Sequence, residues 1–318
     1  MHSGSLSLDS LSGGLDLRAT LESGQSYLWR REDGHAYASG DAVAEADAAE
    51  SPWYYTVLDL DAADRAAVPA PDDEPHVVRA RVVDDELEWE ATCDAHDLVV
   101  HLLRLDDDLD AIVADAPDDP FIHDAYDAYR GLRLVQDPPF GCLVSFICSA
   151  QMRVERIHEM VSSLARAYGD EVSFDGRTYH AFPRPEQLAA ATEADLRDLG
   201  LGYRAPYVQR TAEMVATGEA HPADFFDMGY EDARDAMTTF VGVGDKVADC
   251  ILLFSLGYLE AIPLDTWMQT VVADYYPDCD RGNYADTSRA LRDRFGGEYA
   301  GYVQTYVFHL LRVGEDSP

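Results

Sequence analysis

The fold of this chain is decided by residues 242–250, which read Gly242-Val243-Gly244-Asp245-Lys246-Val247-Ala248-Asp249-Cys250. The glycines predict a tight turn, because glycine adopts positive φ readily and allows the backbone to approach closely. An amphipathic helix is predicted before the turn, over 230–240, and a helix that is apolar on nearly every face after it, over 246–256. The N–H groups that start the second helix can hold a phosphate, so Gly242 and Gly244 are candidate DNA-binding residues.

Lys246 is the single lysine of the chain, beside twenty-three arginines. Arginine supplies positive charge and phosphate contacts, but in proteins it does not lose its proton to become a neutral amine. A retained lysine therefore suggests chemistry that needs an amine, such as nucleophilic attack or a Schiff base. Burial and the positive end of the helix both favour the neutral amine. Alternatively, the lysine remains by chance at a position that tolerates either lysine or arginine.

Asp265 stands nineteen residues after Lys246, at the predicted N-cap of a helix over 266–275. A carboxylate there could stabilise positive charge developing on a sugar and pass protons to or from the amine. From spacing alone, Asp265 is better explained as an ordinary N-cap. Because it is paired with the only lysine of the chain, the catalytic interpretation becomes the better one. Cys250 lies one turn after Lys246 on the same helix face, where a core role is common.

The composition limits the function classes. Sixty acidic against twenty-four basic residues give a formal charge of −36, which excludes a basic-tailed protein that binds nucleic acid through bulk electrostatics. This acidity resembles that of proteins from extreme halophiles, where molar salt shortens the Debye length to about 3 Å. Apolar residues run through the whole chain, which argues against disorder. No apolar run reaches the eighteen residues of a membrane span, and residues 1–14 lack signal-peptide features, so we expect a cytoplasmic protein without membrane contact.

The five cysteines are widely spaced and form no CxxC pair. Structural zinc and an iron–sulfur cluster are therefore not expected. We expect no required cofactor, although a monovalent or divalent cation could bind at the glycine hairpin.

The predicted class is α+β, with an N-terminal antiparallel β-sheet domain with helices over 1–118 and an all-helical domain over 119–318. Strands are predicted over 26–30, 53–58 and 77–91. Helices are predicted over 94–105, 109–116, 143–150, 154–168, 185–199, 205–217, 230–240, 246–256, 266–275, 287–295 and 301–312.

The hairpin stretch, followed by Ile262-Pro263-Leu264-Asp265, resembles the helix-hairpin-helix DNA glycosylases, and within them the eukaryotic type of 8-oxoguanine DNA glycosylase/AP lyase. Further segments stand in the family's order from about residue 21 to residue 312. They are Ser23-Gly24-Gln25-Ser26-Tyr27-Leu28-Trp29, Gln136-Asp137-Pro138, Ser145-Phe146-Ile147-Cys148-Ser149, Leu199-Gly200-Leu201-Gly202-Tyr203-Arg204-Ala205 and Tyr299-Ala300-Gly301-Tyr302-Val303-Gln304.

The resemblance implies a bifunctional, monomeric enzyme that acts on double-stranded DNA containing oxidised guanine opposite cytosine. It would flip the damaged base out of the duplex. Lys246 would attack the anomeric carbon, expel the base and form a Schiff base that permits β-elimination. Asp265 would stabilise the cationic sugar and assist proton transfer.

The resemblance also assigns the substrate-binding residues. Phe308 and Cys250 would sandwich the flipped base, Gln304 would read its Watson–Crick edge, and the Gly24 carbonyl would accept the N7–H that distinguishes 8-oxoguanine from guanine. Met268 belongs to the same substrate-binding set.

On the opposite strand, Tyr203 would fill the gap left by the flipped base, and Arg204 with Arg156 would contact the orphaned cytosine. The chain departs from the family at two positions. Gln151 stands where the family has an asparagine for the same cytosine, and Trp267 stands where it has a histidine.

Three alternatives remain open. A 3-methyladenine-type monofunctional glycosylase would use the aspartate but lack the lysine, and a non-catalytic helix-hairpin-helix module would only dock on phosphates. A Schiff-base aldolase is the most distant, because nothing suggests an α/β barrel. An endonuclease III-like enzyme would need a C-terminal four-cysteine cluster, which the sequence lacks.

Overall fold

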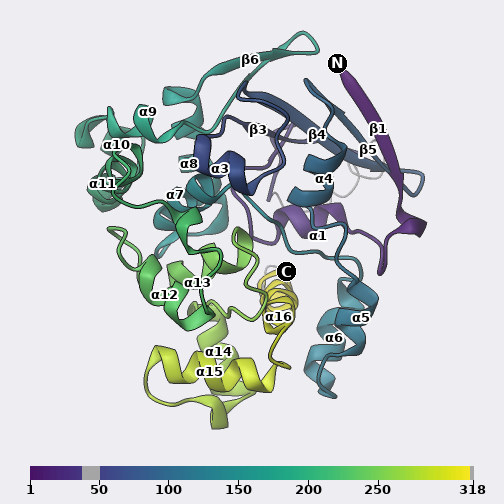
Figure 1. Cartoon of the computed structure of the whole chain (residues 1–318). Helices are drawn as coiled ribbons and strands as arrows, with labels where there is room; N and C mark the ends of the chain where they lie inside the picture. The colour runs from purple at the N-terminus through teal and green to yellow at the C-terminus, as the bar shows by residue number, and fades with distance from the viewer. Residues whose placement is uncertain (38–50, 316–318) are drawn as a thin grey trace.

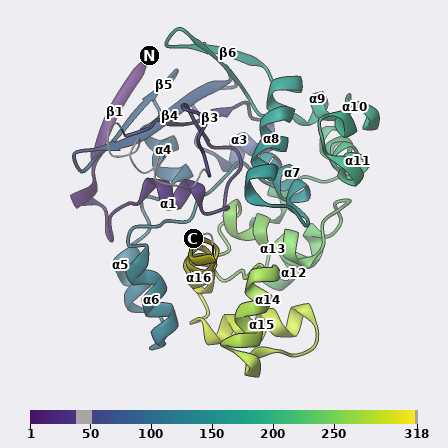
Figure 2. The ribbon, with the colours of Figure 1, turned by 180° about the vertical axis from the view of Figure 1, so that it is seen from behind.

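The computed structural model describes residues 1–37 and 51–315 and confirms the α+β class (Figure 1). The N-terminal part holds a five-stranded antiparallel sheet in the order β1-β5-β4-β3-β2. Its strands are β1 (His2–Ser7), β2 (Arg30–Arg31), β3 (Tyr54–Leu58), β4 (His76–Val83) and β5 (Glu86–Ala91). The sheet lies at one end of the molecule and the helices α14 and α15 at the other, and Figure 2 shows the same arrangement from behind.

Helices make up most of the regular structure in the rest of the described chain. Those that accompany the sheet are α1 (Leu17–Glu22), α3 (Ala62–Ala67), α4 (His96–Leu102) and α5 (Leu109–Ala114), with the 3-10 turn η1 (Leu8–Ser10). The later helices are α6 (Pro120–Ala128), α7 (Pro139–Ser149), α8 (Val154–Tyr168), α9 (Pro185–Ala189), α10 (Glu193–Asp198), α11 (Ala205–Ala216), α12 (Tyr230–Met237), α13 (Asp245–Phe254), α14 (Thr266–Asp274), α15 (Tyr284–Arg294) and α16 (Ala300–Glu315), with the 3-10 turns η2 (Gly202–Arg204), η3 (Pro222–Phe225) and η4 (Pro277–Cys279). None of the described helices combines the length and apolar character needed to cross a bilayer.

Several local predictions need correction. The alternating stretch 77–91 is a hairpin of β4 and β5, because Asp84 and Asp85 both adopt positive φ at the turn, which short polar residues tolerate. The stretch 185–199 is two helices, because the Thr192 side chain accepts the Asp195 N–H and starts a new helix.

A small β-hairpin also interrupts the mainly helical part. The strands β6 (Glu171–Phe174) and β7 (Arg177–His180) pair antiparallel. Phe174 and Tyr179 pack with Val57 and Val77 of the main sheet. The sequence pattern predicted no strand there.

The core runs without interruption from the N-terminal part into the helical part. Every residue of α7 is buried, so this helix forms the centre of the molecule. The last helix, α16, returns to the N-terminal part, where the Tyr306 hydroxyl donates to the Leu132 carbonyl at 2.6 Å and Arg312 donates to the Glu22 carbonyl. The predicted boundary near residue 118 falls between α5 and α6, and the division into two domains stays a prediction.

Candidate active site

The glycine hairpin joins α12 to α13 as the sequence predicts. Gly242 has a φ of +91°, and a Cβ added there would lie 2.9 Å from the Cβ of Tyr207, so glycine is required on two grounds. Gly244 is the N-cap of α13, with no side-chain cap and open space around it. The first N–H groups of α13 are thus left without a side-chain partner, at an exposed turn that an anion can approach.

Lys246 points from the first turn of α13 toward α7. Its Nζ donates to the Ser149 Oγ at 3.3 Å and lies 5.6 Å from the centroid of the Phe146 ring. Neither contact is a carboxylate, although the chain is rich in them. The amine is half-buried, between a hydroxyl and an aromatic face.

Cys250 and Asp265 lie close enough to Lys246 for its charge to act on both. Burial raises the pKa of the Cys250 thiol to about 12, although the Lys246 charge opposes that rise. Burial also raises the pKa of Asp265, against the Met268 N–H and the Lys246 charge. The Asp265 carboxylate accepts the Met268 N–H at 2.9 Å, so it caps α14.

The structure brings Gly24 and Phe308 together beside this group. Gly24 has a φ of +92°, and a Cβ added there would lie 3.7 Å from the Phe308 ring and 3.9 Å from the Tyr27 hydroxyl. Tyr27 packs edge-on against Phe146, with ring centroids 5.7 Å apart, and Phe146 in turn contacts Lys246. Segments near the two ends of the chain therefore meet at Gly24, and the Tyr27 and Phe146 rings connect this meeting point to the lysine.

Gln304 and Met268 are buried. Gln304 lies one turn before Phe308 on α16 and is 4% exposed, and its Oε1 accepts the Thr305 hydroxyl at 3.3 Å. The Met268 side chain is fully buried, and its backbone N–H caps onto Asp265. Met268 thus contacts the candidate site through its backbone N–H, which donates to Asp265.

Two of the opposite-strand candidates, Tyr203 and Arg204, lie in the turn η2 and reach the Ala150 carbonyl after α7. Tyr203 is 53% exposed, and its hydroxyl donates to that carbonyl at 3.4 Å. Arg204 is buried beneath it, with its guanidinium carbon 4.4 Å from the Tyr203 ring centroid, and donates to the same carbonyl. The exposed Tyr203 ring therefore packs against the buried Arg204 guanidinium in a cation–π contact.

Arg156 and Gln151 complete the set of predicted site residues. Arg156 extends along the Gly200 backbone and pairs with Glu159 at 2.8 Å. Gln151 is exposed, with a φ of +56°, a left-handed conformation that is uncommon for glutamine. Trp267 is half-buried in the first turn of α14.

Sequence reasoning missed the partners of the catalytic candidates. Ser149, Phe146 and Tyr27 stand in segments that carried the resemblance, and they were given no role there. The only sequence signal for these residues was that their segments stand in the family's order. The contacts of Ser149 and Phe146 with Lys246 become visible only in the fold, where α7 packs against the lysine.

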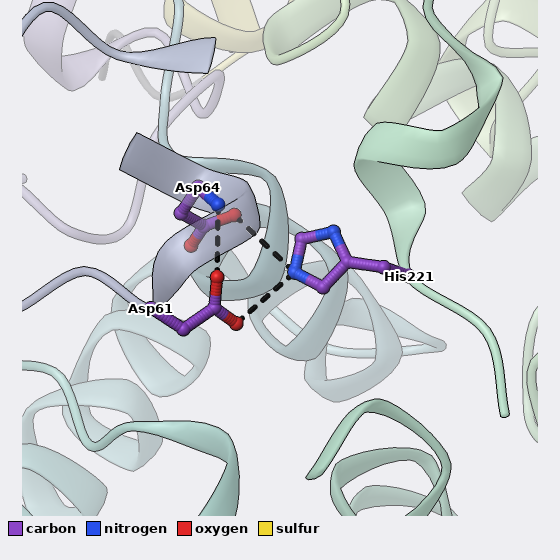
Figure 3. A group of neighbouring side chains, drawn as sticks. All are labelled: Asp61, Asp64 and His221. Carbon is purple, nitrogen blue, oxygen red and sulfur yellow. Dashed lines mark hydrogen bonds and ion pairs between the residues drawn. The ribbon is translucent and has the colours of Figure 1, made fainter. Parts of the chain in front are cut away.

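A separate cluster of Asp61, Asp64 and His221 joins α3 to η3 (Figure 3). The His221 Nε2 lies 3.1 Å from the Asp61 Oδ2 and 3.7 Å from the Asp64 Oδ1. The His221 Nδ1 accepts the Ala223 N–H at 3.1 Å, so the Nε2 carries the ring proton and donates to Asp61. A metal would need that nitrogen's lone pair, so this geometry is that of a hydrogen-bonded junction and not of a metal centre.

Two family matches cover most of the chain. Residues 144–296 match the HhH-GPD superfamily of base excision DNA repair proteins, and residues 7–143 match the N-terminal domain of 8-oxoguanine DNA glycosylase.

Relatives and solved structures agree with these matches. The probable N-glycosylase/DNA lyase of Methanothermobacter thermautotrophicus is 35% identical over 59% of this chain and 66% of its own length. The N-glycosylase/DNA lyase of Saccharomyces cerevisiae is 36% identical over 56% of each chain. The matches thus span between about half and two thirds of these curated relatives.

The structural likeness extends further along the chain. The structure of MBOgg1 in complex with a low-affinity DNA ligand is similar with a TM-score of 0.80 and 26% identity, over 99% of this chain and 96% of that one. The 8-oxoguanine glycosylase/lyase of Clostridium acetobutylicum, bound to double-stranded DNA with cytosine opposite 8-oxoguanine, shares the fold at a TM-score of 0.76 and 23% identity, over 95% of this chain and 93% of that one. The chain belongs to the HhH-GPD superfamily of base excision DNA repair proteins and carries the N-terminal domain of the 8-oxoguanine DNA glycosylases.

Proposed function

We propose that this chain is a bifunctional DNA glycosylase and AP lyase that excises 8-oxoguanine opposite cytosine from duplex DNA and cleaves the resulting abasic strand. The observation that carries the proposal is the chain of contacts from Gly24 and Phe308 through the Tyr27 and Phe146 rings to the sole lysine, with Cys250 and Asp265 within range of its charge. The relatives named as N-glycosylase/DNA lyases support the pairing of the two activities.

The chemistry follows from the position of the amine. The Lys246 ammonium first gives up a proton to solvent. The neutral nitrogen then attacks C1′ of the flipped nucleotide, and the electrons of the glycosidic bond leave with the base. Loss of a proton from nitrogen and opening of the sugar give a Schiff base. Removal of the C2′ proton then breaks the C3′–O bond. The Asp265 carboxylate stabilises the cationic sugar in the first step and accepts protons in the later ones.

Recognition uses the remaining site residues. Phe308 and Cys250 stack on the flipped base, Gln304 reads its edge, and the Gly24 carbonyl accepts its N7–H. Met268 supports this pocket through the cap that it makes with Asp265.

Tyr203 fills the gap in the duplex, while Arg204, Arg156 and Gln151 contact the cytosine. Gly242 and Gly244 hold a phosphate at the hairpin, where a cation can assist. The enzyme acts as a monomer on DNA, in the cytoplasm at the nucleoid.

Borohydride trapping tests the proposal. Wild-type protein incubated with 8-oxoguanine:cytosine duplex and borohydride should form a covalent protein–DNA complex. Lys246→Gln should form none, and neither should Lys246→Arg, which keeps the positive charge but has no amine to offer. Both variants should still bind the duplex.

The other outcomes separate the alternatives. A covalent complex with Lys246→Gln would remove the lysine from the mechanism. Release of methylated purines without strand cleavage would identify a 3-methyladenine-type enzyme. Equal affinity for damaged and undamaged duplex, with no product, would identify a non-catalytic module.

A further inference from the structure

Asp249 is a fully buried carboxylate that the proposed chemistry does not use. It lies on α13, three residues after Lys246, so the two residues are neighbours along the same helix. Its two oxygens accept hydrogen bonds from two tyrosines at 2.7 Å each. One donor is Tyr230, the first residue of α12, and the other is Tyr284, the first residue of α15.

The two tyrosines differ in what else they hold. The Tyr284 hydroxyl also accepts the Leu264 N–H at 3.0 Å. Leu264 immediately precedes Asp265, the proposed catalytic carboxylate. Within the described part of the chain, the Tyr230 hydroxyl makes no hydrogen bond to this segment. Two consecutive hydrogen bonds therefore link the helix that carries Lys246 to the residue before Asp265, and both pass through Tyr284.

This link matters because Lys246 and Asp265 come from separate elements. Lys246 is fixed by α13, whereas Asp265 stands at the end of an irregular segment that leads into α14. Leu264 is buried, so its N–H needs a protein partner, and the Tyr284 hydroxyl supplies one. A shift of that segment would move the carboxylate relative to the amine, and misplacement by about 1 Å can cost a hundredfold in rate.

We propose that Tyr284, held by Asp249, is a positioning residue that sets the geometry of Asp265 relative to Lys246. This inference rests on the proposed function. It assigns no contact with DNA to either residue, so loss of the link should slow base excision and leave DNA binding unchanged.

The experiment compares Tyr284→Phe with Tyr230→Phe. Each change removes one hydroxyl donor from the same buried carboxylate, and Tyr284→Phe also leaves the Leu264 N–H without its partner, so Tyr284→Phe should lose somewhat more thermal stability than Tyr230→Phe. Tyr284→Phe should lower the single-turnover rate of 8-oxoguanine excision at saturating enzyme by about tenfold. Tyr230→Phe should stay within about twofold of wild type. Both should bind a duplex with an abasic-site analogue within about twofold of the wild-type Kd.

Equal rates for the two variants would overturn the inference, and so would a loss that appears in Kd instead of the rate. If wild-type protein excises no base, the proposed function fails, which is a separate result.

If Tyr284→Phe does not fold, amide hydrogen exchange of the wild-type protein tests the inference instead. The Leu264 amide should be strongly protected relative to that of the exposed Thr266, and equal exchange would overturn the inference.

Discussion

Burial and the neighbours of Asp265 act on its pKa in opposite directions. Burial raises the pKa of the carboxyl above 3.8, while the Met268 N–H and the Lys246 charge lower it, and the rise prevails. Stabilising a cationic sugar requires the ionised form. Because the folded-state pKa is raised, that form is lost at a higher pH than for a free aspartate as the solution is acidified.

The excision rate should therefore fall on acidification at a pH above the ordinary aspartate pKa. Single-turnover rates measured from about pH 8 down to about pH 4, with circular dichroism to follow the fold, test this. Asp265→Asn is the control, because the buried carboxyls of Asp64, Asp137 and Asp249, each with a pKa raised to about 7, also titrate in this range. If the excision rate of Asp265→Asn fell over the same acidic pH range, that fall would be caused by the titration of another group.

Single residues can be predicted from the sequence where they belong to a short motif. Lys246 stands in such a motif, and the role predicted for Asp265 comes from its pairing with that lysine. The hydrogen bond of Lys246 to Ser149 joins residues 97 apart, and that of Tyr284 to Asp249 joins residues 35 apart. Periodicity and spacing hold no information on such contacts, because they depend on how distant elements pack.

The hairpin between α12 and α13 offers a test at the scale of elements. Gly242→Ala should lower the unfolding free energy by about 1–3 kcal/mol, because alanine is strained at a φ of +91° and its Cβ would meet Tyr207. Gly244→Ala should leave the melting temperature unchanged, because φ is −109° and the space is open. Its methyl group would stand where the phosphate binds, so duplex affinity should fall roughly fivefold, about 1 kcal/mol.

Thermal melts and duplex titrations of the two variants measure both quantities. A stable Gly242→Ala protein would show that Tyr207 moves aside at little cost. A Gly244→Ala protein with wild-type affinity would show that the phosphate does not approach this turn.

Elements with strong periodicity were predicted well. The predicted bounds of 154–168 coincide with α8, whose apolar residues repeat at helical spacing. Breaks were harder to predict, because a single cap at Thr192 or the turn at Asp84 and Asp85 divides a segment whose pattern is otherwise continuous. The β6–β7 hairpin is four residues per strand, too short for alternation to stand out.

At the scale of the whole molecule, the negative charge is partly neutralised by arginines. Arg79, for example, lies between Glu32, Glu90 and Asp175. Sixty acidic residues against twenty-four basic ones still leave many carboxylates without a basic partner. Their mutual repulsion opposes the compact state in dilute buffer, and it opposes the approach of DNA phosphates as well.

The cations at the candidate site are held differently. Among the described residues, Lys246 donates to a hydroxyl and Arg204 to a backbone carbonyl, and neither makes a direct ion pair with a carboxylate, although the Lys246 charge acts on Asp265. Under the proposed function, DNA binding would depend on a few local contacts and on N–H groups of the hairpin, more than on a broad positive surface. Such contacts are short, and salt screens them less than it screens charges farther apart.

Stability and activity should therefore both persist at high salt. Raising KCl from about 0.1 M to about 1 M shortens the Debye length from about 10 Å to about 3 Å, which weakens the carboxylate repulsion. We expect the melting temperature to rise by roughly 5 °C, about 3 kcal/mol for a chain of this size, and the excision rate to persist or peak near molar KCl. Sucrose at matched water activity is the control, because it excludes volume without screening charge. A strong optimum at low salt, with loss of excision above it, would show that long-range attraction to DNA outweighs the repulsion between carboxylates.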